Sequence, residues 1–282
     1  PTVCGLSNIP CNSLPKVLFS TPSFTQNAFN EYPTPFGNLF TNGRSQYLIR
    51  KADLNSAGIT AGKLNSLAFN ILQLNGSIKK YSNFSINIGC TNLTALPNAS
   101  SASQPFIAGL LPVYSHTNQA ISLGWQTYNF TQPFMWDGVS NIIIEVCFSF
   151  PNLGGAGNSS QNVSVELKQM PYIANMYHVE HANQVCGGSQ QANNGTGVPM
   201  LNGINMLPNM RFGFCNVSDP TTYSVSISNN GLITANFSND SITIAPNFST
   251  PAGTVIYTVS VQNPDGGCIT KQTITAFYPP IN

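Results

Sequence analysis

The stretch LGWQTYNFTQPFMWDGVSNIIIEVCFSF, residues 123–150, decides the fold of this chain. From residue 142 onward apolar side chains recur at period two, which is the period of a β-strand. Asp137-Gly138 supplies turn chemistry just before this strand, because Gly tolerates positive φ and Asp can bond its own backbone. A strand with one continuous apolar face and a single charge is typical of the middle of a β-sandwich. Its expected core face consists of Ile142, Ile144, Val146, Phe148 and Phe150, and its other face of Ile143, Glu145, Cys147 and Ser149.

The composition indicates a folded, extracellular protein. The chain has 282 residues, of which 41% are hydrophobic and only 7% are charged, where roughly 25% charged is usual for globular proteins. Its net charge of +1 gives no attraction to nucleic acid or to an anionic membrane. We find no apolar run as long as a membrane span and no signal peptide. The proline-rich end at residues 278–280 favours a piece of a longer secreted polypeptide.

Apolar alternation, interrupted by Gly, Asn and Pro, predicts an all-β fold with a single helical turn near residues 52–57. The number of strands and the long loops favour a jelly-roll-like β-sandwich over residues 16–215. Residues 1–15 are predicted to be a linker or the edge of a preceding module. Residues 216–282, with short strands and tight turns, are predicted to form a small immunoglobulin-like β-sandwich.

The sequence WDGVSN at 136–141, followed by its apolar strand, resembles the signature of a β-sandwich module in secreted surface proteins of Bacteroidetes. Three further segments agree with it: QYLIRKADL at 46–54, AGITAGKLNSLAF at 57–69 and PNMRF at 208–212. Together they span most of residues 40–215. Such modules occur in proteins exported by the type IX secretion system, including very large adhesins of gliding bacteria. The resemblance implies a jelly-roll-like fold and a place on the cell surface.

The seven cysteines include no CxxC pair, which argues against a zinc ribbon. In an extracellular chain most of them should form disulfides. We predict a bond between Cys147, which ends the central strand, and Cys186, which begins a Gly-rich loop. A second predicted bond, between Cys215 and Cys268, would staple the small domain.

A third predicted bond joins Cys4 to Cys11 near the start of the chain. This set leaves Cys90 as a buried free thiol, which behaves as a small hydrophobe. In the rival pairing Cys90 is bonded to Cys147, and Cys186 is free.

No set of residues forms a recognisable catalytic or metal-binding motif. Glu145 lies in mid-strand and would suit a glycosidase acid if buried, but pairing with a basic group, Arg50 or Arg211 for example, or exposure to solvent explains it better. In YHVEH at 177–181, a strand would place His178 and Glu180 on one face and His181 on the other, so the three do not converge on a metal. We therefore predict no catalytic residue, no metal site and no cofactor, with calcium held by loop oxygens as an open alternative.

Aromatic side chains offer a different kind of site. Trp125, Tyr172 and Tyr177 are candidate glycan-contact residues, because aromatic side chains line many ligand sites and can stack on sugar rings. The alternative is that Trp125, like Trp136, fills the core, since large aromatics dominate protein cores.

The favoured interpretation is a non-enzymatic structural or adhesive segment of a large secreted cell-surface adhesin of a gliding-type bacterium. Its expected partners are neighbouring modules of the same polypeptide, together with surface glycans or other cell-surface proteins. The alternative is a carbohydrate-binding module of a secreted protein. An enzyme domain, such as an accessory region of a glycosidase or protease, is the third hypothesis.

Overall fold

A computed structural model shows an all-β protein. It describes residues 14–20, 25–26, 34–37, 39–75, 80–99, 102–149, 163–181, 185–187, 191–192, 205–215, 224–227, 232–236, 241–245, 253–262 and 268–278. The predicted helical turn is present as α1 (Lys51–Ser56), which connects two strands of different sheets.

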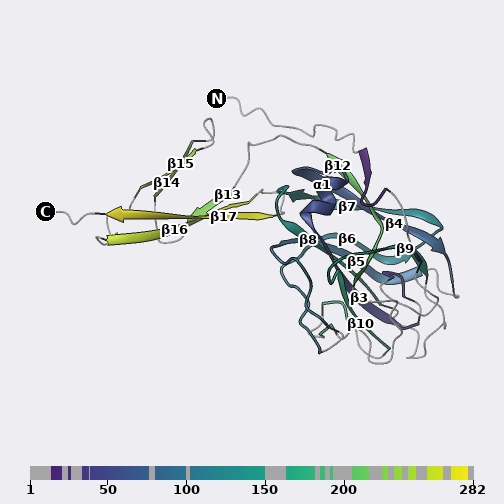
Figure 1. The fold of residues 1–282 in the computed structure, drawn as a ribbon. Helices are drawn as coiled ribbons and strands as arrows, with labels where there is room; N and C mark the ends of the chain where they lie inside the picture. Colours follow the sequence, from purple (N-terminus) through teal and green to yellow (C-terminus); the bar gives the residue numbers. More distant parts are fainter. Residues whose placement is uncertain are drawn as a thin grey trace.

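Two antiparallel sheets form the larger part of the molecule (Figure 1). The first contains β1 (Leu14–Val17), β12 (Met210–Cys215), β4 (Gly62–Gln73) and β7 (Gly124–Trp136), in that order. It is extended from the end of β4 by β9 (Ser164–Gln169), β11 (Met206–Pro208) and β2 (Thr25–Gln26). The second sheet contains β10 (Asn175–Glu180), β3 (Asn42–Ile49), β8 (Asn141–Ser149), β5 (Lys80–Thr91) and β6 (Leu111–Ala120).

The order of these strands is that of a jelly roll. The chain crosses between the sheets from β3 to β4, from β4 to β5, from β6 to β7 and from β7 to β8. The result is one sheet with the order β1-β12-β4-β7 facing another with the order β3-β8-β5-β6, which is an eight-stranded double Greek key. The predicted all-β sandwich is therefore confirmed. Its first strand begins at Leu14, inside the segment 1–15 that was expected to be a linker.

The strands after residue 223 pair only among themselves within the described residues. A three-stranded antiparallel sheet contains β13 (Ser224–Ile227), β16 (Gly253–Gln262) and β17 (Ile269–Tyr278), and a hairpin contains β14 (Leu232–Asn236) and β15 (Ser241–Ala245). The antiparallel strands fit the expected β-structure of residues 216–282, and their packing as an immunoglobulin-like sandwich stays a prediction. The start of β17 lies against the jelly roll, where the Cys268 amide donates a hydrogen bond to the Met135 carbonyl at 3.1 Å (Figure 1).

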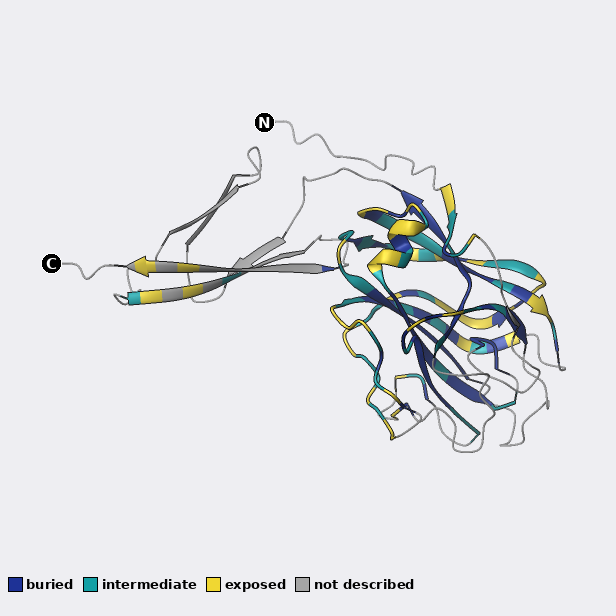
Figure 2. Cartoon of the chain, in the orientation of Figure 1, coloured by how far each residue is buried: buried dark blue, intermediate teal, exposed yellow. Residues whose placement is uncertain are grey.

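The core lies between the two jelly-roll sheets, where the strands appear mostly dark blue in Figure 2. Aromatic rings fill its centre: Phe84 stacks on Phe36 and on Tyr128, with ring centroids 6.0 and 5.1 Å apart. The side chains predicted to form this core are all at most 2% exposed, namely Ile142, Ile144, Val146, Phe148, Trp136, Phe69, Ile86 and Phe212. The period-two pattern of β8 therefore identified the inner face correctly.

The outer face of β8 is buried as well, which the alternation alone did not indicate. Ile143 and Cys147 are at most 1% exposed, and Glu145 is 5% exposed. The segment between β5 and β6 crosses this face. It is anchored there by a β-bridge between Gln104 and Ala192 and by a hydrogen bond that the Leu96 amide donates to the Ile173 carbonyl. β8 is thus a central strand with no face open to solvent.

We expect Ile144→Ala to lower the free energy of unfolding by about 2–4 kcal/mol, because it leaves a cavity between two packed sheets. Chemical denaturation followed by tryptophan fluorescence measures this change. Val139→Ala is the control, since Val139 is 64% exposed in the turn before the same strand. Equal unfolding midpoints for the two variants would contradict the assignment of the core face.

Candidate functional site

The WDGVSN segment forms a closed turn between β7 and β8. The Asp137 carboxylate accepts hydrogen bonds from the backbone amides of Val139 and Ser140, at 3.0 and 2.8 Å, and from the Ser140 hydroxyl at 2.6 Å. The indole of Trp136 donates to the Ser140 carbonyl at 2.9 Å. Gly138 has φ +79°, and a Cβ there would lie 3.1 Å from Ala61. The aspartate of the signature is therefore used to build the turn.

Asn141, the last residue of the signature, ties this turn to two other segments. Its side-chain oxygen accepts a hydrogen bond from the Lys51 amide at the start of α1, at 2.8 Å. Its side-chain nitrogen donates to the Leu93 carbonyl, also at 2.8 Å. The asparagine holds together the helix, the turn and the segment that follows β5.

The QYLIRKADL segment has an equally structural role. Asp53 caps α1 by accepting a hydrogen bond from the Arg50 amide at 3.2 Å, and it accepts another from the Tyr172 hydroxyl at 2.8 Å. The Arg50 guanidinium lies over the Tyr172 ring, 3.8 Å from its centroid, and donates to the Thr94 carbonyl. Burial and the neighbouring Asp53 carboxylate raise the pKa of Tyr172, so this phenol stays neutral.

The PNMRF segment completes the pattern. Asn209 accepts from the Phe19 amide and donates to the Phe19 carbonyl and to Glu166. Met210 and Phe212 are fully buried in the core. The segments that carry the resemblance thus supply caps, turns and core contacts, which explains how they specify a fold without specifying a chemistry.

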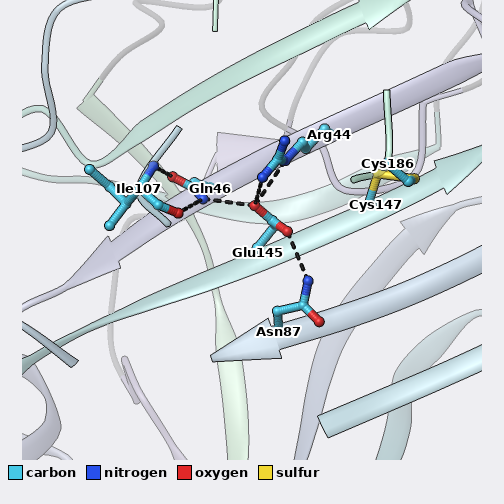
Figure 3. A network of polar contacts seen from close by, with 7 residues as sticks. All are labelled: Arg44, Gln46, Asn87, Ile107, Glu145, Cys147 and Cys186. Atoms are coloured by element: carbon cyan, nitrogen blue, oxygen red, sulfur yellow. Dashed lines mark hydrogen bonds and ion pairs between the residues drawn. A yellow bond between two sulfur atoms is a disulfide. The ribbon is translucent and has the colours of Figure 1, made fainter. Parts of the chain in front are cut away.

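A buried polar network surrounds Glu145 on the outer face of β8 (Figure 3). Three side chains from the two neighbouring strands donate to its carboxylate: Arg44 at 2.9 Å, Gln46 at 2.7 Å and Asn87 at 2.8 Å. Gln46 in turn makes two 2.8 Å bonds with the backbone of Ile107. The network therefore fastens the segment before β6 onto the sheet.

Glu145 is paired with a basic group, as predicted, but this group is neither Arg50 nor Arg211, and the alternative that Glu145 faces solvent is wrong. Arg44 forms the ion pair at 2.9 Å, and its guanidinium also lies 4.3 Å from the centroid of the Phe106 ring. Arg50 is engaged with Tyr172, and Arg211 lies against Trp125 on the other sheet. Three donors on the two neighbouring strands fix the position of the Glu145 carboxylate, which gives it a structural role in joining these strands.

We expect Glu145→Gln to lower the free energy of unfolding by about 3–5 kcal/mol, because it leaves the Arg44 charge buried without its counter-ion. Glu180→Gln is the matched control, since Glu180 lies near the edge of the same sheet and is more exposed. The double change Glu145→Gln with Arg44→Met should recover part of the loss, as measured by urea denaturation. A Glu145→Gln variant as stable as the control would show that the ion pair does not contribute to the free energy of unfolding.

The disulfides agree with one predicted pair and overturn another. Cys147 and Cys186 are bonded as expected, with their Cα atoms 5.7 Å apart. Cys268 is bonded to Cys90 rather than to Cys215, which is itself in a different disulfide. Cys90 is therefore not a free thiol. The pair predicted between residues 4 and 11 lies outside the described residues.

The strand register explains why Cys90 meets Cys268 and not Cys147. Cys90 lies opposite Ile142 on the core face at the end of β5, whereas Cys147 lies on the outer face with Glu145. Thiols on opposite faces of one sheet cannot bond. Cys268, 8% exposed, packs into the end of the core beside Cys90.

Non-reducing peptide mapping should recover one peptide pair that contains residues 147 and 186 and another that contains residues 90 and 268. Cys186→Ala should lower the free energy of unfolding by about 3–4 kcal/mol, since the bond closes a loop of about 40 residues. A cross-linked peptide joining residues 215 and 268 would contradict the assignment.

The YHVEH segment contains the last four residues of β10 and the residue that follows it. His178 and Glu180 share a face, as predicted, with the His178 Nε2 atom 3.6 Å from a Glu180 carboxylate oxygen. His181 instead packs against Phe40, with ring centroids 4.7 Å apart. Among the described residues, no group of three or more His, Cys, Asp and Glu side chains is arranged to hold a metal ion.

The three candidate glycan-contact aromatics have different environments. Tyr172 and Tyr177 are 7% and 1% exposed, so both rings are buried. The prediction that these two tyrosines contact a glycan is therefore wrong. Trp125 is half-buried on the outer face of β7, with the Arg211 guanidinium 4.9 Å from its ring centroid. It is not a core residue, in contrast to Trp136, which is 2% exposed.

No helix within the described ranges is long and apolar enough to span a bilayer. Comparisons with protein-family models, with curated proteins and with solved structures found no match.

Proposed function

We propose that this chain is a non-enzymatic structural and adhesive segment of a large secreted cell-surface protein, of the kind that gliding bacteria export by type IX secretion. The proposal takes its cellular setting from the resemblance of the WDGVSN, QYLIRKADL and PNMRF segments to modules of such proteins. Its physical support is the way in which the two β-units are joined.

The observation that carries the proposal is the bond between Cys90 and Cys268. Cys90 ends a strand that is paired on both edges, to β8 and to β6. Cys268 directly precedes β17, which pairs along its whole length with β16. A pull on the second unit therefore enters the jelly roll through a covalent bond at the end of β5, without passing along the 177 residues that lie between these cysteines.

Such a connection suits a protein that transmits tension. Strand pairing and core packing yield under load, whereas a disulfide holds until it is reduced. The Glu145 network and the Cys147–Cys186 bond fasten the covering segments onto the same sheet, so the loaded strand lies beside a strand that is itself cross-linked. Stacked β-sandwiches joined in this way hold binding surfaces away from the cell.

Single-molecule force spectroscopy with handles at residues 92 and 277, attached without cysteine chemistry, tests the load path. Both sites are exposed. Residue 92 lies two positions after Cys90 and residue 277 lies nine positions after Cys268, so the intact protein should extend by no more than about 40 Å. Cys268→Ser should release on the order of 100 residues, hence several hundred ångströms, in stepwise unfolding events.

Cys186→Ser is the matched control, because it removes a disulfide outside the direct path and should extend no further than the intact protein. Equal extension of the Cys268→Ser variant and the intact protein would refute a covalent load path through residue 268.

A further inference from the structure

The outer face of the first jelly-roll sheet has an ordered polar surface. Arg211 on β12, Ala68 on β4 and Thr127 on β7 lie opposite one another in register. The Arg211 guanidinium reaches across the small Ala68 side chain, which is only 1% exposed, and donates to the Thr127 hydroxyl at 3.2 Å. The arginine is thus held flat against the sheet instead of extending into solvent.

A second set of residues in register lies beside Arg211, Ala68 and Thr127. Trp125 on β7 is opposite Asn70 on β4, and the Asn70 amide donates to the Glu166 carboxylate on β9 at 3.2 Å. Asn209 donates to the same carboxylate oxygen at 2.9 Å. The indole, the guanidinium and the carboxylate are therefore each fixed by neighbours on adjacent strands of one sheet.

These groups keep hydrogen-bonding capacity that the described residues do not use. Arg211 has five N–H donors, of which one is directed to Thr127, and it forms no ion pair within the described residues. Glu166 Oε2 accepts both amides, which leaves Oε1 without a described donor. Trp125 thus shares one sheet face with the Arg211 guanidinium and with a Glu166 carboxylate oxygen, for which the described residues supply no further partner.

We propose that this surface, formed by Trp125, Arg211, Asn70 and Glu166, binds a neutral polysaccharide. A pyranose ring has an apolar CH face that packs on indole, and adjacent hydroxyls that donate to a carboxylate and accept from a guanidinium. One cation and one anion together favour a neutral sugar over an acidic one, because Glu166 would repel a carboxylate or sulfate. This inference rests on the adhesive role proposed above and gives it a ligand class.

The chain allows a clean optical test, since it has two tryptophans and one of them, Trp136, is buried. Soluble β-glucan, mannan and galactan, with alginate as the acidic comparison, are titrated into the full chain. Acrylamide quenching of fluorescence and calorimetry are recorded. At least one neutral polysaccharide should bind and protect Trp125 from the quencher. Trp125→Ala and Glu166→Gln should each weaken binding at least tenfold.

Arg211→Lys keeps the charge but loses the donor fork, and should also weaken binding. Phe277→Ala is the control, because Phe277 is an exposed aromatic on the other unit and should leave binding unchanged. Thermal melts establish that each variant is folded. Three results would overturn the proposal: no binding of any neutral polysaccharide, binding that survives Trp125→Ala, or binding of alginate alone. None of them alters the outcome of the force experiment, which involves no ligand.

Discussion

The jelly roll depends on the burial of β8 on both of its faces. Its inner side chains pack between the two sheets, and its outer face contains Glu145, whose carboxylate would be costly to bury alone. Arg44, Gln46 and Asn87 supply the charge and the hydrogen bonds that make this burial possible. Because Gln46 also bonds Ile107, the same network holds down the segment that covers the strand. The network in this way stabilises β8, its two neighbouring strands and the segment that covers them as one unit.

Much of this fold could be predicted from local patterns. Alternation from Ile142 to Phe148 identified the core face, and Asp137-Gly138 identified the turn, because both signals depend on residues that are adjacent in the chain. The partner of Glu145 could not be found in this way, since Arg44 is 101 residues away and meets it only through the β3–β8 register. The bond from Cys90 to Cys268 depends on how two units meet, which no local pattern records. Sequence reasoning named Trp125 as a candidate glycan contact but did not place Arg211 and Glu166 on the same sheet face, because the three residues lie on different strands.

The residues that carry the family resemblance stabilise the scaffold through contacts with their surroundings. Asp137 closes a turn, Asp53 caps a helix, and Asn141 and Asn209 each connect segments distant in sequence. Conserving such positions would preserve the scaffold and leave the outer sheet faces free to vary. The ligand preference of such a module would then be set by surface residues such as Trp125, outside its signature.

The bond between Cys90 and Cys268 also sets an order for the formation of the disulfides. A chain that emerges with its N-terminus first presents Cys147 and Cys186 within 39 residues of each other, whereas Cys90 must wait 178 residues for its partner. Pairing of β5 with β8 keeps the waiting thiol on the opposite face from Cys147, so the sheet itself prevents the wrong bond. A chain that ends before residue 268 consequently keeps residue 90 as a thiol, which the whole chain holds in a disulfide. The redox state of one side chain thereby distinguishes a chain that contains residue 268 from one that ends before it.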